Sequence, residues 1–103
     1  MRIKDIIAIK EVLSDLDSGE AFYASQNPEV GVYFRDCIIA DIESLWLYAG
    51  IHVSCFGVHR MLSTKFPYAI YYEVQNNICI VVAVLDMRRN PAWIQNKLKK
   101  RKC

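Results

Sequence analysis

The stretch FPYAIYYEVQNNICIVVAVLDMRRNPAW, residues Phe66–Trp93, decides how the rest of the chain folds. Within it, the polar turn Gln75–Asn77 separates two runs rich in β-branched and aromatic residues, Ala69–Val74 and Ile78–Leu85. This pattern is typical of a β-hairpin, and asparagine suits the tip because it tolerates the positive φ angles of hairpin turns. The second run is apolar at odd and even positions alike, so we expect a central strand covered on both faces.

Length and composition place the chain among globular proteins with one domain. It has 103 residues, of which 53% are hydrophobic and 23% are charged. No apolar run approaches the ~20 residues of a membrane span, and the apolar start is too short for a secretory signal, so we expect a cytoplasmic protein without a membrane partner. The four cysteines match no zinc or redox spacing, which predicts no metal site, and nothing predicts a cofactor. Cys37 and Cys79 are interpreted as small buried hydrophobes.

Charge is unevenly distributed along the chain, although the net charge is only +2. Five of the last seven residues are basic, and they form a predicted basic tail at residues 97–103 that ends in an exposed thiol, Cys103. The acidic residues gather in the first half of the chain. Such asymmetry suits a polyanionic partner, but basic residues also stabilise the last turn of a helix, so both interpretations stay open.

The first half of the chain predicts an edge strand followed by two helices. Alternating residues within Ile3–Val12 indicate a short edge strand. Ser14, with an acid three residues later, resembles a capping box and starts a predicted helix that runs to about Ser25. Asn27-Pro28 ends that helix and begins the next, which we expect to continue to Gly50. Because the link is so short, the two helices should form an antiparallel hairpin.

The second half predicts a sheet and a last helix. We expect an irregular connection over Ile51–Val58 and then a strand over His59–Phe66. The alternation of residues in that strand indicates that one of its faces is exposed to solvent. With the hairpin that opens this subsection, it forms a three-stranded antiparallel meander. Asn90-Pro91 begins a final short helix over Ala92–Lys100. The expected fold is therefore α+β, in the order β-α-α-β-β-β-α, with the helical hairpin packed on one face of the meander.

Two segments carry a family pattern. Residues 66–74 have the form Phe-Pro-Tyr-x-Ile-x-Tyr-x-Val, and GEAFYASQNPEVGVYFRDCI has the aromatic, turn and helix positions of a helix–loop–helix. A strand, a leucine, two arginines, a proline and a tryptophan follow the first pattern, here as Val84, Leu85, Arg88, Arg89, Pro91 and Trp93. Together with the order of elements, these features resemble the RelE/ParE superfamily of bacterial toxins, and most of all its ParE-like, plasmid stabilisation branch. The resemblance covers nearly the whole chain and implies one toxin domain over residues 1–103.

This resemblance implies the toxin half of a type II toxin–antitoxin pair, neutralised by a small antitoxin encoded beside it. ParE-type toxins poison DNA gyrase, whereas RelE-type toxins cut messenger RNA on the ribosome. The chain has neither tyrosine nor histidine after Arg89, which favours a gyrase-inhibiting binding protein over an enzyme. Two alternatives stay open: a ribosome-dependent endoribonuclease, and a degenerate, non-toxic interaction module. Asp86 and Asn90, where many relatives have histidine and aspartate, motivate the latter.

Each alternative has its own candidate site residues. Cleavage of RNA needs a base, an acid and cations, and the candidates are His59, Lys65, Arg88 and Arg89. If the second face of the central strand is an antitoxin groove, its candidate residues are Met61, Tyr71, Tyr72 and Trp93. Target binding is assigned to Arg60, Arg88 and Arg89. Two other occupants of that face stay open, namely the C-terminal helix folded back over it and a second copy in a homodimer.

Overall fold

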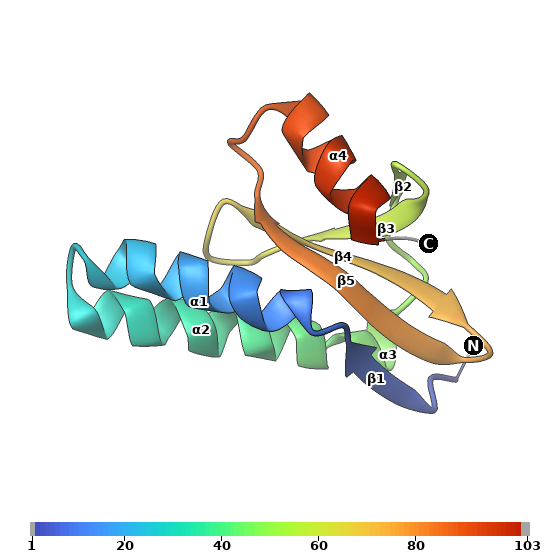
Figure 1. Cartoon of the computed structure of the whole chain (residues 1–103). Coiled ribbons are helices and arrows are strands. Elements are labelled where there is room, and N and C mark those ends of the chain that lie inside the picture. The colour runs from blue at the N-terminus through green and yellow to red at the C-terminus, as the bar shows by residue number, and fades with distance from the viewer. Residues whose placement is uncertain (1, 102–103) are drawn as a thin grey trace.

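A computed structural model of the chain describes residues 2–101, so that Lys102 and Cys103 of the predicted tail lie outside the described residues. A five-stranded sheet carries a helical hairpin on one face and the last helix on the other (Figure 1). In chain order the elements are β1 (Asp5–Ala8), α1 (Glu11–Ala24), α2 (Pro28–Glu43), α3 (Leu45–Tyr48), β2 (Ser54–Cys55), β3 (Val58–Leu62), β4 (Tyr68–Gln75), β5 (Ile78–Asp86) and α4 (Pro91–Arg101). The predicted α+β fold class is confirmed.

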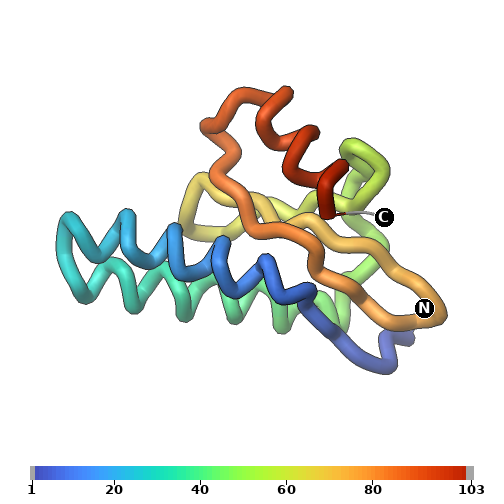
Figure 2. The backbone as a smooth tube through the Cα atoms, in the orientation of Figure 1, coloured from blue at the N-terminus to red at the C-terminus, as the bar shows by residue number. Residues whose placement is uncertain are grey.

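The sheet is built on the predicted hairpin of β4 and β5. Asn76 and Asn77 form its tip with φ angles of 53° and 64°, as their side chains allow. The strand order is β1-β5-β4-β3-β2, in which β1 is parallel to β5 and the remaining pairs are antiparallel. Strand β5 therefore has a neighbour on each side, and Figure 2 shows β1 lying along it although the two are far apart in sequence. The prediction of a central strand is confirmed.

Close approach of α1 and α2 makes the helical hairpin a rigid layer. Gly31 permits this approach, since a Cβ atom there would lie 2.9 Å from the carbonyl oxygen of Glu20 on α1. Arg35 of α2 reaches back to the carboxylates of Asp17 and Glu20. The Asn27 side chain accepts the Glu29 N–H at 2.9 Å and so caps α2, as the sequence predicts.

An aromatic cluster joins this hairpin to the sheet. The ring of Phe34 on α2 lies 4.8 Å from that of Tyr68 on β4 and 5.1 Å from that of Phe66, measured between centroids. Tyr23 of α1 completes the cluster, with its ring 4.8 Å from that of Phe66. Edge-to-face contacts of this kind add to the burial of large rings. The first face of the sheet is therefore closed by the helical hairpin, as we expected.

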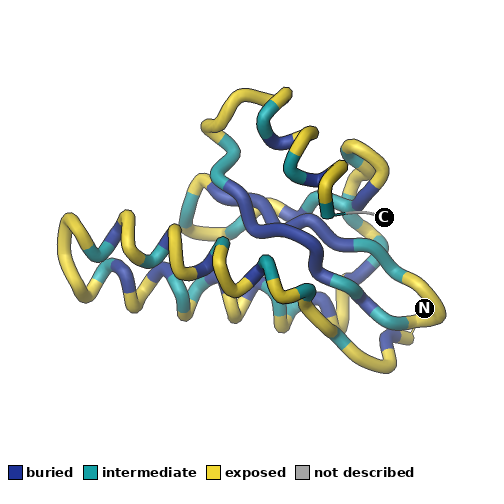
Figure 3. The backbone as a smooth tube through the Cα atoms, viewed as in Figure 1, coloured by how far each residue is buried: buried dark blue, intermediate teal, exposed yellow. Residues whose placement is uncertain are grey.

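The second face of the sheet is covered by the last helix. Ile94 and Leu98 of α4 are buried against Val58, Tyr71 and Leu85. Figure 3 shows the buried backbone of the central strands lying between the two helical layers. Of the covers that the sequence leaves open for this face, the structure contains the folded-back C-terminal helix. Cys79 lies in the core between the sheet and the helical hairpin. Burial there raises the pKa of its thiol to about 11 and keeps it protonated.

Several predicted boundaries are wrong for identifiable reasons. Helix α1 begins at Glu11 rather than Ser14, and no side-chain hydrogen bond caps it. The predicted second helix is divided at Ser44 into α2 and α3, although Ser44 keeps helical angles while its hydroxyl donates to the Asp41 carbonyl oxygen at 2.6 Å, and α3 ends at Tyr48. Strand β3 ends at Leu62 rather than Phe66.

The early end of β3 has its own cause, the carboxylate of Asp41. It accepts hydrogen bonds from the Ser63 hydroxyl at 2.8 Å and from the Thr64 N–H at 3.3 Å, which holds the next loop against α2. The connection after Gly50, predicted to be irregular, contains the two-residue strand β2, which pairs with β3. So short an edge strand has little sequence signal of its own.

A buried ion pair closes the part of the β5 edge that β1 does not reach. Strand β1 pairs with β5 only as far as Val81. Beyond it, the Val84 N–H donates to Asp15 Oδ2 at 2.9 Å, and the Val82 carbonyl oxygen accepts from Arg101 Nη1 at 3.2 Å. Asp15 and Arg101 are joined by two further bonds of 2.6 and 2.8 Å, and both side chains are buried. The hydrogen bonds to Asp15 raise the pKa of the Arg101 guanidinium, so the charged pair is stable.

We predict that Arg101→Ala lowers the free energy of unfolding by about 3 kcal/mol, because it leaves the Asp15 carboxylate buried without its counter-charge. Urea unfolding followed by circular dichroism measures this. Arg88→Ala is the matched control, since it removes an exposed arginine paired with Asp86 and should cost at most about 1 kcal/mol. Equal losses in the two variants would contradict the importance assigned to the buried pair.

Candidate binding groove between the first and last helices

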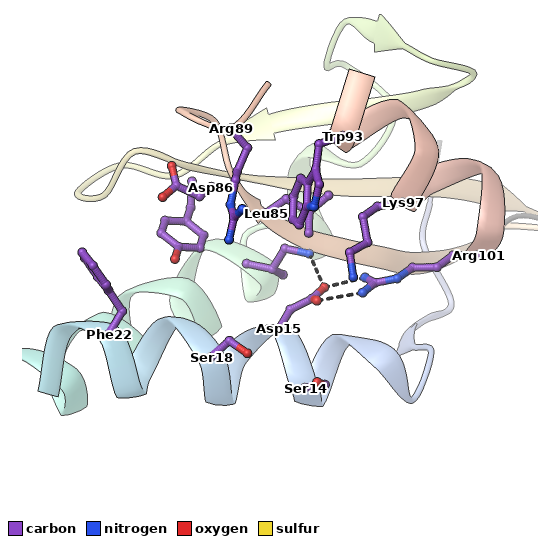
Figure 4. Close-up of a pocket in the computed structure, with 12 residues that line it drawn as sticks. Ser14, Asp15, Ser18, Phe22, Leu85, Asp86, Arg89, Trp93, Lys97 and Arg101 are labelled. Atoms are coloured by element: carbon purple, nitrogen blue, oxygen red, sulfur yellow. Dashed lines mark hydrogen bonds and ion pairs between the residues drawn. The ribbon is translucent and has the colours of Figure 1, made fainter. Parts of the chain in front are cut away.

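A groove of about 540 Å³ lies where α1, α4 and the end of β5 meet (Figure 4). Helix α1 forms one wall and the segment from Arg89 through α4 forms the other, with β5 and Tyr68 of β4 beneath them. The lining residues, from which the groove takes its name here as the α1–α4 groove, are Ser14, Asp15, Ser18, Phe22, Tyr68, Val84, Leu85, Asp86, Arg89, Trp93, Lys97 and Arg101.

Two cations and one indole ring shape the α4 wall. The guanidinium carbon of Arg89 lies 4.5 Å from the centroid of the Trp93 ring, and the Lys97 ammonium lies 5.4 Å from it. Such cation–π contacts fix the positions of long side chains without neutralising their charge. Within residues 2–101, neither Arg89 nor Lys97 forms an ion pair with a carboxylate. The groove therefore has two positive charges available to a ligand.

Both acidic residues of the groove, Asp15 and Asp86, are paired with arginines of the same chain. Asp15 pairs with Arg101, as described above. Asp86 accepts from the Arg88 side chain at 2.8 and 3.0 Å and from the Arg88 N–H at 2.8 Å. Hydrogen bonds from Arg88 lower the pKa of the Asp86 carboxyl, which is therefore ionised at neutral pH. Arg88 also lies over the Phe22 ring at 5.9 Å, so its side chain is part of the turn that ends β5.

Of the four residues predicted to bind an antitoxin, three are core residues. Met61, Tyr71 and Tyr72 are at most 6% exposed, because each lies on an inner strand beneath a helical layer. In this structure they offer no surface to a partner, contrary to the prediction that they line an antitoxin groove. Trp93 is half-buried and lines the α1–α4 groove. That tryptophan stays a candidate contact.

The candidate residues for RNA cleavage are not brought together. His59 pairs with Tyr72 across β3 and β4, whereas the two arginines follow Asp86, which pairs with Tyr68. Tyr72 lies four residue steps along the strand from Tyr68, which corresponds to ~13 Å. Lys65 lies in the loop that adjoins the arginine end, where the Met87 N–H donates to the Pro67 carbonyl oxygen at 2.9 Å. Three cations thus share one end of the sheet, and the histidine lies apart from them.

His59 belongs instead to a cluster with a second histidine, which sequence reasoning did not single out. The Tyr72 hydroxyl accepts the Gly50 N–H at 2.8 Å and lies 2.5 Å from Nδ1 of His52. The His59 ring stacks on that of Tyr72 with centroids 5.0 Å apart, and its Nδ1 donates to the His52 carbonyl oxygen at 2.8 Å. Burial, and secondarily the proximity of His59, lowers the pKa of His52. The cluster anchors the connection between α3 and β3 to the sheet.

Arg60 also lies away from the groove. It is opposite Tyr71 on the face of the sheet that α4 covers, and its Nη1 is 3.9 Å from the sulfur of Cys55. Its Nε is buried and has no hydrogen-bond partner among residues 2–101. The assignment of Arg60, Arg88 and Arg89 to target binding stays a prediction, and among the three only Arg89 lines the groove.

The lining favours a particular ligand chemistry. Phe22, Trp93 and Leu85 supply apolar and aromatic surface, while Arg89 and Lys97 supply charge and Ser14 and Ser18 supply hydroxyl groups. Such a groove suits a peptide segment that carries an apolar anchor beside one or two carboxylates. Sequence reasoning had placed Lys97 only in a basic tail and had not selected Phe22, because the groove brings together residues from opposite ends of the chain.

Two other classes of site are not found in the part of the chain that the structure describes. No group of three or more His, Cys, Asp or Glu side chains within residues 2–101 could hold a metal ion. Of the helices described, none is both long and apolar enough to cross a lipid bilayer.

Comparison with known proteins identifies a shared fold. No protein-family model matches the sequence, and no curated protein sequence matches it. Among solved structures, the chain is similar to one from the "Chromosomal ParDE TA system from P. aeruginosa", with a TM-score of 0.70 and 15% sequence identity. The similarity covers 78% of this chain and 91% of that one. At this identity the likeness concerns the fold, and it confirms the fold that the RelE/ParE resemblance implies.

The lowered pKa of His52 predicts a pH-dependent loss of stability. In the unfolded chain a histidine titrates near pH 6.5, so below that pH the unfolded state binds more protons than the folded state does. The stabilising contribution is therefore complete above about pH 6.5 and is lost as the pH falls through the lower pKa of folded His52. His52→Gln should give a flatter dependence of unfolding free energy on pH between about 7 and 5. Urea unfolding at several pH values tests this, and equal slopes for both proteins would contradict it.

Proposed function

We propose that this protein is the toxin component of a type II toxin–antitoxin system. The observation that carries the proposal is the fold shared with a chain of the ParDE TA system from P. aeruginosa, which covers 78% of the present chain. The sequence pattern of residues 66–93 supports it independently, because that pattern resembles the ParE-like branch of toxins. A cognate antitoxin, encoded beside it, is the expected partner.

The α1–α4 groove is the proposed contact for the antitoxin. Its apolar surface around Phe22 and Trp93 would take a hydrophobic side chain of an antitoxin segment. A neighbouring carboxylate of the same segment would pair with Arg89 or Lys97, whose charges have no acidic partner within residues 2–101. An aromatic anchor beside a charge-assisted hydrogen bond is a combination that gives both affinity and orientation.

Inhibition of DNA gyrase by binding is the proposed mode of action. The separation of His59 from Lys65, Arg88 and Arg89 supports binding over RNA cleavage, since acid–base catalysis needs its groups within hydrogen-bond reach of one substrate. The His59 ring is also stacked on Tyr72, and its Nδ1 is occupied by the His52 carbonyl oxygen. These contacts suit a structural role for that histidine.

Induced expression in a bacterial host should halt growth, and co-expression of the small protein encoded next to this chain should restore it. Arg89→Glu combined with Lys97→Glu should weaken binding to that antitoxin by about tenfold or more, because the groove would then repel its carboxylates. Lys99→Glu with Lys100→Glu is the matched control, since both lysines are exposed on α4 and neither lines the groove. Unimpaired growth on induction of the wild-type protein would refute the toxin proposal.

A supercoiling assay with purified protein tests the target. We expect inhibition of gyrase that is relieved when the antitoxin is added. If supercoiling proceeds normally while primer extension on translated messages detects cleavage, the endoribonuclease alternative replaces the gyrase proposal. Replacement of His59, Lys65, Arg88 and Arg89 by alanine would then show whether those residues form the cleavage site.

A further inference from the structure

The outer side of α2 and α3 has a seven-residue repeat that the core does not use. Acids recur at one position of the repeat, and apolar residues occur three and four positions after each acid. We name this surface the heptad face. Its acidic row is Glu29, Asp36 and Glu43; its apolar rows are Val32, Ile39, Trp46 and Tyr33, Ala40, Leu47.

These rows lie side by side because the helical path continues through Ser44. That residue keeps helical angles of φ −62° and ψ −18°, and its carbonyl oxygen accepts the Tyr48 N–H at 3.1 Å. Seven residues make about two turns of helix, so residues at this spacing form rows along the helix axis. Phe34, Ile38 and Leu45 occupy the opposite, buried side. Figure 3 shows exposed backbone recurring along the side of α2 that is turned away from the sheet.

The apolar and acidic rows of the heptad face are exposed, although the ring of Tyr33 at one edge also lies 5.6 Å from that of Phe66 between centroids. Among its apolar residues with large side chains, exposure runs from 41% for Ile39 to 80% for Leu47. No residue of the acidic row forms an ion pair within residues 2–101, although Asp17 and Glu20 on the adjacent helix do so with Arg35. A contiguous row of large exposed apolar residues beside unpaired charges is typical of an interaction surface.

We propose that the heptad face docks an amphipathic helix of a partner protein that carries Lys or Arg at seven-residue intervals. The basic residues of that helix would lie along Glu29, Asp36 and Glu43, and its apolar residues would pack against the two flanking rows. A strict seven-residue repeat is the spacing at which two helices keep one seam in contact over several turns. Opposite charges across such a seam set which partner binds and in which orientation.

Charge excludes the other occupants of this surface. A second copy that packed its own α2 here would place acid against acid, which is unfavourable. The basic α4 of a second copy is unsuitable because Ile94 and Leu98, its buried apolar residues, are committed to its own sheet. Nucleic acids and anionic membranes carry the same sign of charge as the acidic row. None of the nine residues lines the α1–α4 groove, so this interaction is independent of the proposed function.

The test uses two synthetic peptides of about three heptads, long enough to be helical when bound. Both have leucine and isoleucine on one face; one has lysine at each position facing the acids, and the other has glutamate there. Isothermal titration calorimetry should show the lysine peptide binding the full-length protein about tenfold or more tightly than the glutamate peptide, with affinity falling as salt is raised. Asp36→Lys with Glu43→Lys should reverse this preference. Glu29 is left unchanged because a carboxylate in the first turn stabilises α2.

Asp5→Lys with Glu73→Lys is the matched control, because it changes the net charge by the same amount on other surfaces, leaves the first turn of every helix unchanged and should keep the wild-type preference. Circular dichroism confirms that each variant is folded before binding is measured. Failure of the lysine peptide to bind, or binding that the Asp36 and Glu43 substitutions leave unaffected, would overturn the proposal. A dimer in sedimentation experiments that those substitutions alter would overturn it in favour of self-association. An RNA oligonucleotide that competes with the lysine peptide would do so in favour of nucleic acid.

Discussion

The ion pair between Asp15 and Arg101 joins the first helix, the last helix and the central strand at one buried point. Asp15 belongs to α1, Arg101 ends α4, and both bond to the edge of β5. A buried charge without a partner destabilises the fold. A buried ion pair whose hydrogen-bonding groups are all satisfied fixes the geometry of the elements it joins. Here they satisfy two backbone groups of β5 that β1 is too short to reach. Together with the packing of Ile94 and Leu98, the pair therefore holds α4 on the sheet and so bounds the α1–α4 groove.

Helix α4 has two roles as a result. Its inner side, with Ile94 and Leu98, closes the second face of the sheet. Its other side presents Trp93 with Arg89 and Lys97 held against the ring. One side of this short helix covers the sheet and the other forms a charged wall of the groove, so a substitution on either side has consequences for the other. Helix α2 likewise has two distinct sides. Its inner side packs on the sheet through Phe34 and Ile38, and its outer side has the heptad face.

Most of the fold could be predicted from the sequence because its signals are local. The asparagines at the hairpin tip, the doubly apolar β5 and the Asn27-Pro28 boundary each act over a few residues. The site could not be predicted, because its determinants are distant in sequence: Asp15 and Arg101 are 86 residues apart, and no local pattern relates them. The prediction that Tyr71 and Tyr72 line an antitoxin groove fails for a similar reason. An aromatic residue in a central strand is exposed or buried according to whether a helix docks over it: Tyr72 lies under the helical hairpin and Tyr71 lies under α4. In α2, the buried stripe that includes Phe34 and Ile38 is the stronger sequence signal, and it masks the weaker repeat of the heptad face.

The two walls of the α1–α4 groove come from segments that are made at different times during translation. Residues 14–22 emerge early, whereas residues 89–101 emerge only after the whole sheet has been synthesised. Until then β5 has no cover on its second face, and the groove does not exist. The groove therefore forms only once α4 has been made and has docked on the sheet, so a ligand of the groove could not engage the chain before that point.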